Sequence, residues 1–237
     1  MRCENREVYE KLWGEALVAF REGRPQIDDQ LRDKTGDLRR GVTLVLRPSA
    51  EVQRRTRDFM DGLAAVCPGQ YAYPGEDLHV TVLSIVAGSV SWRREIRQLA
   101  ACRDILRNVL RRQRSFTIRF RGVTASPGCV MIQGFPASDG LTLIREEVRA
   151  AFAHAGLGEM LDRRFKVKAA HMTAMRFCNA GADWNQLATV LERHRETNFG
   201  ETTVDALELI WGDWYASGQT VRVLERYSLQ GKSTAIR

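Results

Sequence analysis

The chain contains the same short pattern twice, each time inside a segment that alternates like a β-strand. The first copy is HVTV at residues 79–82, and the second is HMTA at residues 171–174, one in each half of the chain and 92 residues apart. Alternate residues of a strand share a face, so each histidine points to the same side as its threonine, and the apolar neighbours point to the other. If the fold brings the two strands together, two imidazoles and two hydroxyl groups converge.

This set of side chains suits phosphoryl chemistry without a metal. One imidazole can take a proton from water while the other gives one to the leaving oxygen, because histidine titrates close to neutral pH. The threonine hydroxyls can hold the phosphate oxygens. Neither motif brings a carboxylate or thiolate at ligand spacing, so we expect no metal and no other cofactor.

The rest of the chain mixes helix and strand patterns without a regular β-α-β repeat. The predicted helices cover 6–22, 49–67, 91–113, 139–156 and a segment that begins at Asp183. The predicted strands cover 41–48, 78–86, 116–123, 129–135, 170–177, 203–211 and 220–229. This mixed order predicts an α+β fold. No low-complexity segment divides the chain, so we expect one domain over 41–237, preceded by a helical extension over 1–40.

Bulk properties narrow the setting. No apolar run approaches the roughly 20 residues that a membrane span needs, and the charged N-terminus lacks the pattern of a secretory signal. We therefore expect a cytoplasmic protein without a membrane partner and, as the default state, a monomer. The five cysteines are scattered and predict reduced thiols. The formal net charge of +7 favours a polyanionic partner such as a nucleotide or RNA.

The two motifs, HVTV at 79–82 and HMTAMRF at 171–177, resemble those of the two-histidine phosphoesterase superfamily, which includes 2′-5′ RNA ligase-like proteins and cyclic phosphodiesterases. The resemblance covers about residues 41–230. It implies a bilobal fold with two antiparallel sheets, related by a pseudo-twofold axis around a central cleft, and helices outside. It also implies that His79 and His171 are catalytic and that Thr81 and Thr173 bind phosphate.

Arg176 matches the arginine of the common form of the second motif. Strict alternation would place it on the opposite face from His171, so it reaches the site only if the strand bulges or ends first. The resemblance is incomplete near the C-terminus, where Gly212 and Val221 stand at positions at which the family often has serine and tyrosine.

Further candidates for substrate binding come from residue type. Arg119 and Arg121 share a face of one predicted strand and could follow an RNA backbone. Tyr73 and Trp211 could stack against a base. His154 and His194 lie in charged surroundings and are predicted to be surface residues.

Two functions from different classes fit these features. The first is a metal-independent phosphodiesterase that acts on a 2′,3′-cyclic phosphate or a 2′-5′ linkage of a nucleotide or RNA end. The second is a non-catalytic module that binds RNA or a nucleotide through the same basic cleft. The intact paired motifs favour the enzyme, because binding alone does not require two imidazoles beside two hydroxyl groups.

Overall fold

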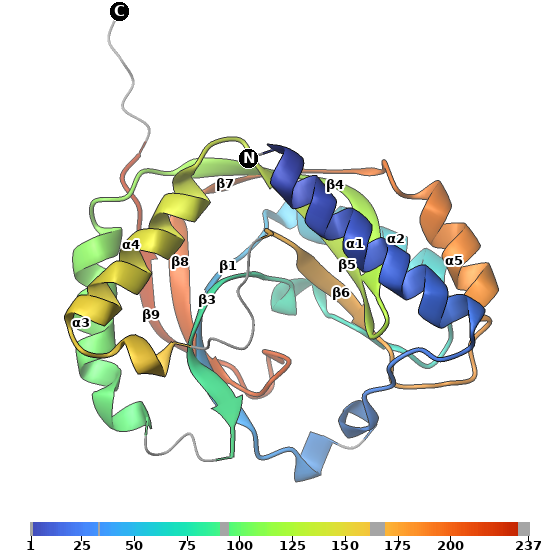
Figure 1. The fold of residues 1–237 in the computed structure, drawn as a ribbon, viewed down its shortest axis with the longest axis horizontal. Coiled ribbons are helices and arrows are strands. Elements are labelled where there is room, and N and C mark those ends of the chain that lie inside the picture. Colours follow the sequence, from blue (N-terminus) through green and yellow to red (C-terminus); the bar gives the residue numbers. More distant parts are fainter. Residues whose placement is uncertain (1, 33, 91–94, 162–168, 232–237) are drawn as a thin grey trace, which may run out of the picture.

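The computed structural model describes residues 2–32, 34–90, 95–161 and 169–231, and these form an α+β fold as expected (Figure 1). The helices are α1 (Arg2–Arg21), α2 (Ala50–Ala64), α3 (Leu99–Leu110), α4 (Gly140–His154) and α5 (Trp184–Arg193). Short 3₁₀ turns, η1 to η5, cover Asp29–Leu31, Lys34–Gly36, Gly75–Asp77, Glu95–Gln98 and Gly158–Met160. None of the helices in the described ranges is both long and apolar enough to cross a bilayer.

The strands of the described residues join one antiparallel sheet in the order β7-β4-β5-β6-β3-β1-β8-β9, with β2 paired to β6. Their bounds are β1 (Arg40–Leu46), β2 (Tyr71–Ala72), β3 (Val80–Ser89), β4 (Phe116–Ser126), β5 (Cys129–Pro136), β6 (Met172–Arg176), β7 (Asn198–Val204), β8 (Ala206–Gly212) and β9 (Arg222–Ser228).

The sheet has two four-stranded halves that meet at the pair β3 and β6. One half runs outward from β6 through β5 and β4 to β7, and the other from β3 through β1 and β8 to β9. The halves are joined by the residue pair Val80 and Met172. The two expected lobes are therefore present, and hydrogen bonds connect their sheets into one curled sheet with the two motif strands at its centre.

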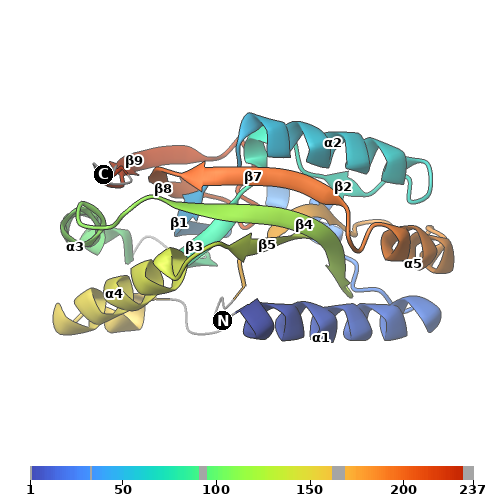
Figure 2. The ribbon, with the colours of Figure 1, turned by 90° about the horizontal axis from the view of Figure 1, so that it is seen from above.

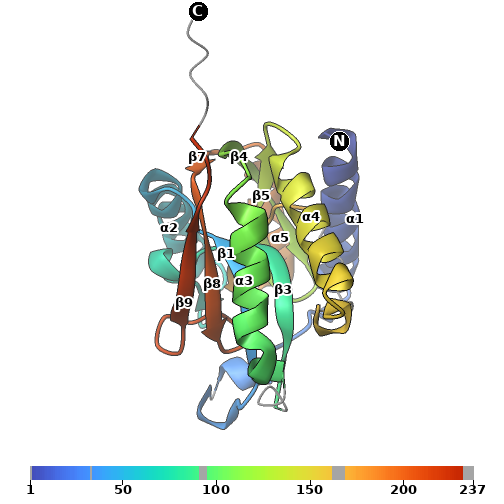
Figure 3. The same ribbon diagram turned by 90° about the vertical axis from the view of Figure 1, so that its left-hand side faces the viewer.

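The helices surround this sheet. In the half that contains β6, α2 packs on β7 and β6 and α5 packs on β4; in the other half, α3 packs on β9 and α4 on β3. Seen from above, α2 lies on one side of the sheet, and α1 and α4 lie on the other (Figure 2). In the end view, α3 lies in front, with β8 and β9 on one side of it and β3 and α4 on the other (Figure 3).

Local signals explain where several helices begin. Ser49 caps α2 by accepting a hydrogen bond from Val52 N, and Asp183 caps α5 by accepting one from Gln186 N. A side-chain acceptor at this position satisfies an amide of the first turn that has no partner inside the helix. The helix predicted from Asp139 begins at Gly140.

Two predicted elements differ from the structure. The helix predicted over 91–113 is α3, which ends at Leu110 and is preceded by η4; residues 91–94 lie outside the described residues. The strand predicted near 203–211 is β8, which begins later than predicted, because the separate strand β7, which was not predicted, ends at Val204 and the two strands separate at Asp205. The chain crosses there between the halves, since β7 pairs with β4 and β8 pairs with β1.

Four cysteines of the described residues are free and buried: Cys67, Cys102, Cys129 and Cys178. His154 is exposed at the end of α4. His194 is only partly exposed, contrary to the prediction, because its ring lies 4.9 Å from that of Phe59 and its Nδ1 is 3.0 Å from Thr197 Oγ1.

Candidate active site

The two histidine motifs lie side by side on neighbouring antiparallel strands. Val80 pairs with Met172, and both are fully buried. β3 begins at Val80 and β6 at Met172, so each histidine lies one residue before its strand. Continuing the register by one residue each way would place His79 opposite Thr173, and His171 opposite Thr81. Residues paired across antiparallel strands share a face, so all four polar side chains lie on one side of the sheet. Each of the four is partly exposed.

This arrangement sets the spacing of the site. Directly opposed side chains have Cβ atoms roughly 4.5–5.5 Å apart, and diagonal neighbours such as the two histidines about 7–8 Å apart. A phosphate group placed over the sheet can therefore lie between the two imidazoles and contact both hydroxyl groups.

A β-bulge brings Arg176 to the same face. In the pairing of β5 with β6, Val130 lies opposite Met175 and Met131 lies opposite Thr173, so Ala174 is an extra residue. The extra residue reverses the alternation. Ala174 and Met175 are both buried, and Arg176 returns to the partly exposed face. The strand therefore bulges before Arg176, as the sequence required if Arg176 was to reach the side of His171.

The first motif strand has a matching bulge. In the pairing of β1 with β3, Leu44 lies opposite Leu83 and Val45 lies opposite Thr81, so Val82 is the extra residue. Ser84 is consequently partly exposed, at the position of β3 that corresponds to Arg176 in β6. The two halves of the site share their backbone geometry but differ here in charge.

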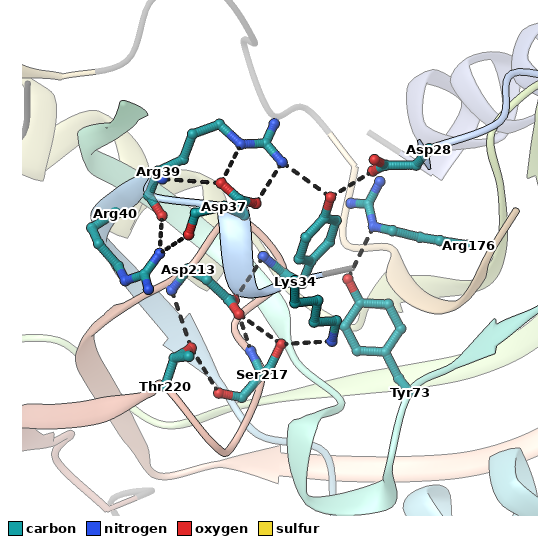
Figure 4. Close-up of polar contacts among 11 residues, drawn as sticks. Asp28, Lys34, Asp37, Arg39, Arg40, Tyr73, Arg176, Asp213, Ser217 and Thr220 are labelled. Carbon is teal, nitrogen blue, oxygen red and sulfur yellow. Dashed lines mark hydrogen bonds and ion pairs between the residues drawn. The ribbon is translucent and has the colours of Figure 1, made fainter. Parts of the chain in front are cut away.

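Arg176 is held by aromatic neighbours (Figure 4). Its Nε donates a hydrogen bond of 3.0 Å to the hydroxyl of Tyr73, and its guanidinium carbon lies 5.7 Å from the centre of the Tyr215 ring. Burial opposes the charge of Arg176, but Tyr73 and Asp28 favour it, and the net effect is a raised pKa. Arg176 therefore stays cationic beside the histidines.

Both histidines are neutral at pH 7 in the free site. Desolvation is the main cause, and it lowers the pKa of His79 and of His171 to about 4. Arg176 adds to the effect at both rings, Arg47 adds to it at His79, and Arg145 adds to it at His171. His79 also has a hydrogen-bond partner that favours its charged form, since its Nδ1 lies 2.8 Å from the carbonyl oxygen of Asp77.

Segments far from the motifs complete the surroundings of Arg176. Tyr215, in the loop between β8 and β9, donates a hydrogen bond of 2.9 Å to Asp28 Oδ2 and accepts one of 3.0 Å from Arg39 (Figure 4). Lys34 Nζ lies 3.9 Å from the centre of the Tyr71 ring. The extension over 1–40 thus reaches this end of the site, which its sequence pattern did not indicate.

The weaker candidates divide into two groups. Tyr73 lies at the site, with its ring 6.4 Å from that of His79, but it is only 7% exposed and is the partner of Arg176. Trp211 lies opposite Val42, three positions along β1 from Val45, the partner of Thr81. An odd separation places Trp211 on the other face of the sheet, where it packs on the main core.

Arg119 and Arg121 lie outside this group of residues. Arg119 forms an ion pair of 2.7 Å with Glu201, and Arg121 forms one of 3.0 Å with Glu196. Together they line surface pockets with Arg195, which follows α5, and with residues of β5 and β7. The structure therefore does not bring them together with the histidines.

Sequence reasoning did not single out several residues that contact the site or its strands: Asp28, Asp77, Ser84, Arg145 and Tyr215. Ser84 had a signal, because it stands 92 residues before Arg176, as His79 stands before His171. Tyr215 lies between Gly212 and Val221, the two positions at which the family often has serine and tyrosine. The loop between β8 and β9 therefore still brings a tyrosine to the site. Among the described residues, no group of three or more histidine, cysteine or acidic side chains is arranged to hold a metal ion.

Comparisons with known proteins identify solved structures with a similar fold. TT0787 of Thermus thermophilus has a TM-score of 0.62 and 18% sequence identity, covering 81% of this chain and 99% of that one. E. coli LigT complexed with 3′-AMP has a TM-score of 0.55 and 16% identity, with coverage of 81% and 98%. These likenesses show a shared fold. A comparison with curated proteins finds no significant match.

A family model described as the 2′-5′ RNA ligase superfamily matches residues 46–214, which is more than half of the chain. The match includes both histidine motifs and the bulged strands that carry them. It confirms the resemblance that the motifs indicated. The chain therefore belongs to the 2′-5′ RNA ligase superfamily.

Proposed function

We propose that this protein is a metal-independent phosphodiesterase that opens a 2′,3′-cyclic phosphate, or cleaves a 2′-5′ linkage, at a nucleotide or RNA end. The observation that carries the proposal is the pairing of Val80 with Met172, which sets the two histidine motifs against each other on one face of the sheet. Both motifs come from one chain, so the site needs no second subunit, and we expect a monomer.

Thr81, Thr173 and Arg176 bind the phosphate in this proposal. The two hydroxyls donate to non-bridging oxygens, and Arg176 contributes a fixed positive charge. Its Nε is engaged by Tyr73, which orients the two terminal nitrogens of the guanidinium group as a fork for phosphate oxygens. Donors fixed in advance stabilise the charge that grows on these oxygens in the transition state.

The two histidines share the proton transfers, and their surroundings distinguish the general acid from the general base. The Asp77 carbonyl accepts from Nδ1 of His79 and so stabilises its protonated form. Two guanidinium groups favour the neutral form of each ring, Arg47 and Arg176 at His79 and Arg145 and Arg176 at His171, so the Asp77 carbonyl is the contact that distinguishes them. We therefore assign His79 as the general acid and His171 as the general base.

For a cyclic phosphate, neutral His171 takes a proton from water through one of its ring nitrogens as the water oxygen attacks phosphorus. The bond from phosphorus to the 2′ or 3′ oxygen breaks, and protonated His79 gives its proton to that oxygen. Attacking and leaving oxygens are roughly in line in phosphoryl transfer, so a base and an acid on opposite sides of the phosphate suit the reaction.

Two further observations support a nucleotide or RNA substrate. Solved structures of E. coli LigT, which has the same fold, are complexed with 3′-AMP and with ATP. The net charge of +7 attracts polyanions to this chain.

The test is hydrolysis of the four nucleoside 2′,3′-cyclic phosphates and of a 2′-5′-linked dinucleotide, in the presence of chelator. His79→Asn and His171→Asn are each expected to lower turnover by about 10²-fold or more. His154→Asn, which changes an exposed histidine at the end of α4, is the matched control and keeps full activity. Full activity of either site variant contradicts the proposal.

The same experiment separates the enzyme from a binding module. If wild-type protein turns over none of these substrates but binds RNA with a steep salt dependence, the non-catalytic function is correct instead.

A further inference from the structure

Just before His171, the backbone is no longer paired with either neighbouring strand. β6 begins at Met172, and among the described residues Val80 and Met172 are the one pair that joins β6 to β3. On the other side, the pairing of β6 with β5 ends at Ile132 and Met172. His171 and the two residues before it therefore lie where regular ladder hydrogen bonds have stopped, although the chemistry requires a fixed imidazole.

Arg145 replaces the ladder on the side of β3. This residue of α4 is 4% exposed. Its Nε donates to Val82 O at 3.0 Å, and its Nη2 donates to Thr81 O at 2.9 Å and to Ala169 O at 3.1 Å. One nitrogen thus joins the backbone of the first motif to the backbone two residues before His171. A buried guanidinium is costly unless such acceptors satisfy it.

Tyr9 replaces the ladder on the side of β5. This residue of α1 is fully buried, and its hydroxyl donates to Gly134 O and accepts from Gly134 N, each at 3.1 Å. Continuing the register of β5 and β6 places Gly134 opposite Ala170, and a Cβ atom added to Gly134 would lie 2.1 Å from Ala170 O. The Tyr9 hydroxyl is therefore bound to the β5 backbone that faces Ala170, and the Ala170 backbone acts on it electrostatically. Thr124 Oγ1 donates to Tyr9 O at 3.1 Å, which anchors α1 at this point.

We propose that Tyr9 and Arg145 are positioning residues that hold residues 169–171 from opposite sides and so orient His171 toward the phosphate. The inference rests on the proposed function, in which His171 is one of the two catalytic groups. It also gives α1 a role: the extension supplies part of the framework of the site.

Tyr9 lies outside the part of the chain that the family model matches. The family model begins at residue 46. The alignments with TT0787 and LigT include 98–99% of those chains but 81% of this one. α1, which ends at Arg21, precedes the matched residues. Arg145 lies inside them and contributes its charge as well as its hydrogen bonds, because it lowers the pKa of His171.

The decisive variant is Tyr9→Phe, which removes one hydroxyl group and keeps the ring. Tyr227→Phe is the matched control, because Tyr227 is also buried and its hydroxyl has no hydrogen-bond partner among the described residues. We expect Tyr9→Phe to lower kcat about tenfold, the cost of one good hydrogen bond, and to leave KM within about twofold. Tyr227→Phe leaves both unchanged.

A second readout does not depend on turnover. Histidine side-chain NMR spectra of Tyr9→Phe are expected to show displaced His171 signals and unchanged His79 signals. Arg145→Met raises the pKa of His171 through loss of charge, and Arg145→Lys retains the low value while still disturbing its signals. Arg176 and Arg47, the other guanidinium groups that act on the two rings, are intact in each variant, and His171 itself also acts on His79.

The outcomes are distinct. Equal effects of Tyr9→Phe and Tyr227→Phe, or equal displacement of both histidines, overturn the positioning role and indicate a general contribution to stability. If wild-type protein shows no turnover, the proposed function fails, but the NMR comparison still decides whether Tyr9 and Arg145 fix His171. Thermal unfolding of each variant verifies that it is folded. If Tyr9→Phe does not fold, Arg145→Lys serves as the second variant.

Discussion

At the scale of single residues, the low pKa of both histidines determines how the protein responds to pH. A productive free enzyme holds one protonated and one neutral imidazole. Because both have a pKa of about 4 in the free site, this form is most abundant near pH 4 and becomes scarcer as pH rises. A bound anionic phosphate favours the charged form of a nearby imidazole and raises its pKa.

Two pH optima are therefore expected. The optimum of kcat/KM, which reports the free enzyme, lies below pH 6.5, and the optimum of kcat, which reports the complex with substrate, lies at higher pH. Initial rates between pH 4 and 8, at low and at saturating substrate, measure both. Coincident optima at pH 7 or above would show that the histidines are not desolvated in this way.

The threonines provide a second prediction at this scale. Thr81→Val and Thr173→Val keep the shape of the side chain and remove the hydroxyl. Each is expected to lower kcat/KM about 10- to 100-fold, because a hydrogen bond to a charged group is worth about 1.5–3 kcal/mol. Thr189→Val, an exposed position on α5, is the control. Unchanged kcat/KM in either site variant would remove the threonine from the phosphate site.

At the scale of elements, the strands β3 and β6 show what local sequence could and could not predict. The alternation of His79 and Thr81 with apolar residues was predictable, because period-two alternation follows from strand geometry alone. The bulges at Val82 and Ala174 were not, because each exists only against a partner strand. The sequence could therefore say only that Arg176 would share the face of the histidines if the strand contained a bulge.

The close approach of β5 to the start of β6 leads to a prediction. A Cβ atom on Gly134 would lie 2.1 Å from Ala170 O, a backbone atom that cannot move without displacing the residues before His171. We expect Gly134→Ala to destabilise the fold by about 1–3 kcal/mol, the typical range for overpacking, and to lower kcat as well. Urea unfolding and steady-state kinetics measure the two effects.

The control for this substitution lies in α1. Gly14 is an exposed helical residue with no atom within 4 Å of an added Cβ. Gly14→Ala should stabilise the protein by up to about 1 kcal/mol, because alanine favours the helix. If Gly134→Ala is equally harmless, the backbone near Ala170 is less constrained than the structure indicates.

At the scale of the whole molecule, the order of contacts along the chain decides what the sequence could predict. The motifs, the helix caps and the α+β class depend on neighbours within a few residues. The bond from Tyr9 to Gly134 spans 125 residues, and that from Arg145 to Val82 spans 63. Their acceptors are backbone atoms, which carry no residue-specific signal, so neither contact could be found before the strands were placed.

Folding also couples the site to the stability of the whole molecule. The ordinary pKa of histidine is 6.5, and the folded protein lowers it to about 4 at His79 and His171. Between these values the unfolded chain binds more protons than the folded one, so the free energy of unfolding falls as pH decreases from 6.5 to 4. Above pH 6.5 the contribution of these two groups is constant and the protein keeps its full stability.

A variant with His79→Asn and His171→Asn tests this coupling, because asparagine does not titrate. Urea unfolding at intervals between pH 7 and pH 4 should show a shallower loss of stability in the variant than in the wild type, while His154→Asn keeps the wild-type slope. The desolvation that lowers the pKa of both histidines thus lowers the stability of the fold in acid. Equal slopes in the wild type and the double variant would mean that these imidazoles retain their ordinary pKa in the folded protein, and the acidic optimum of kcat/KM would then be lost as well.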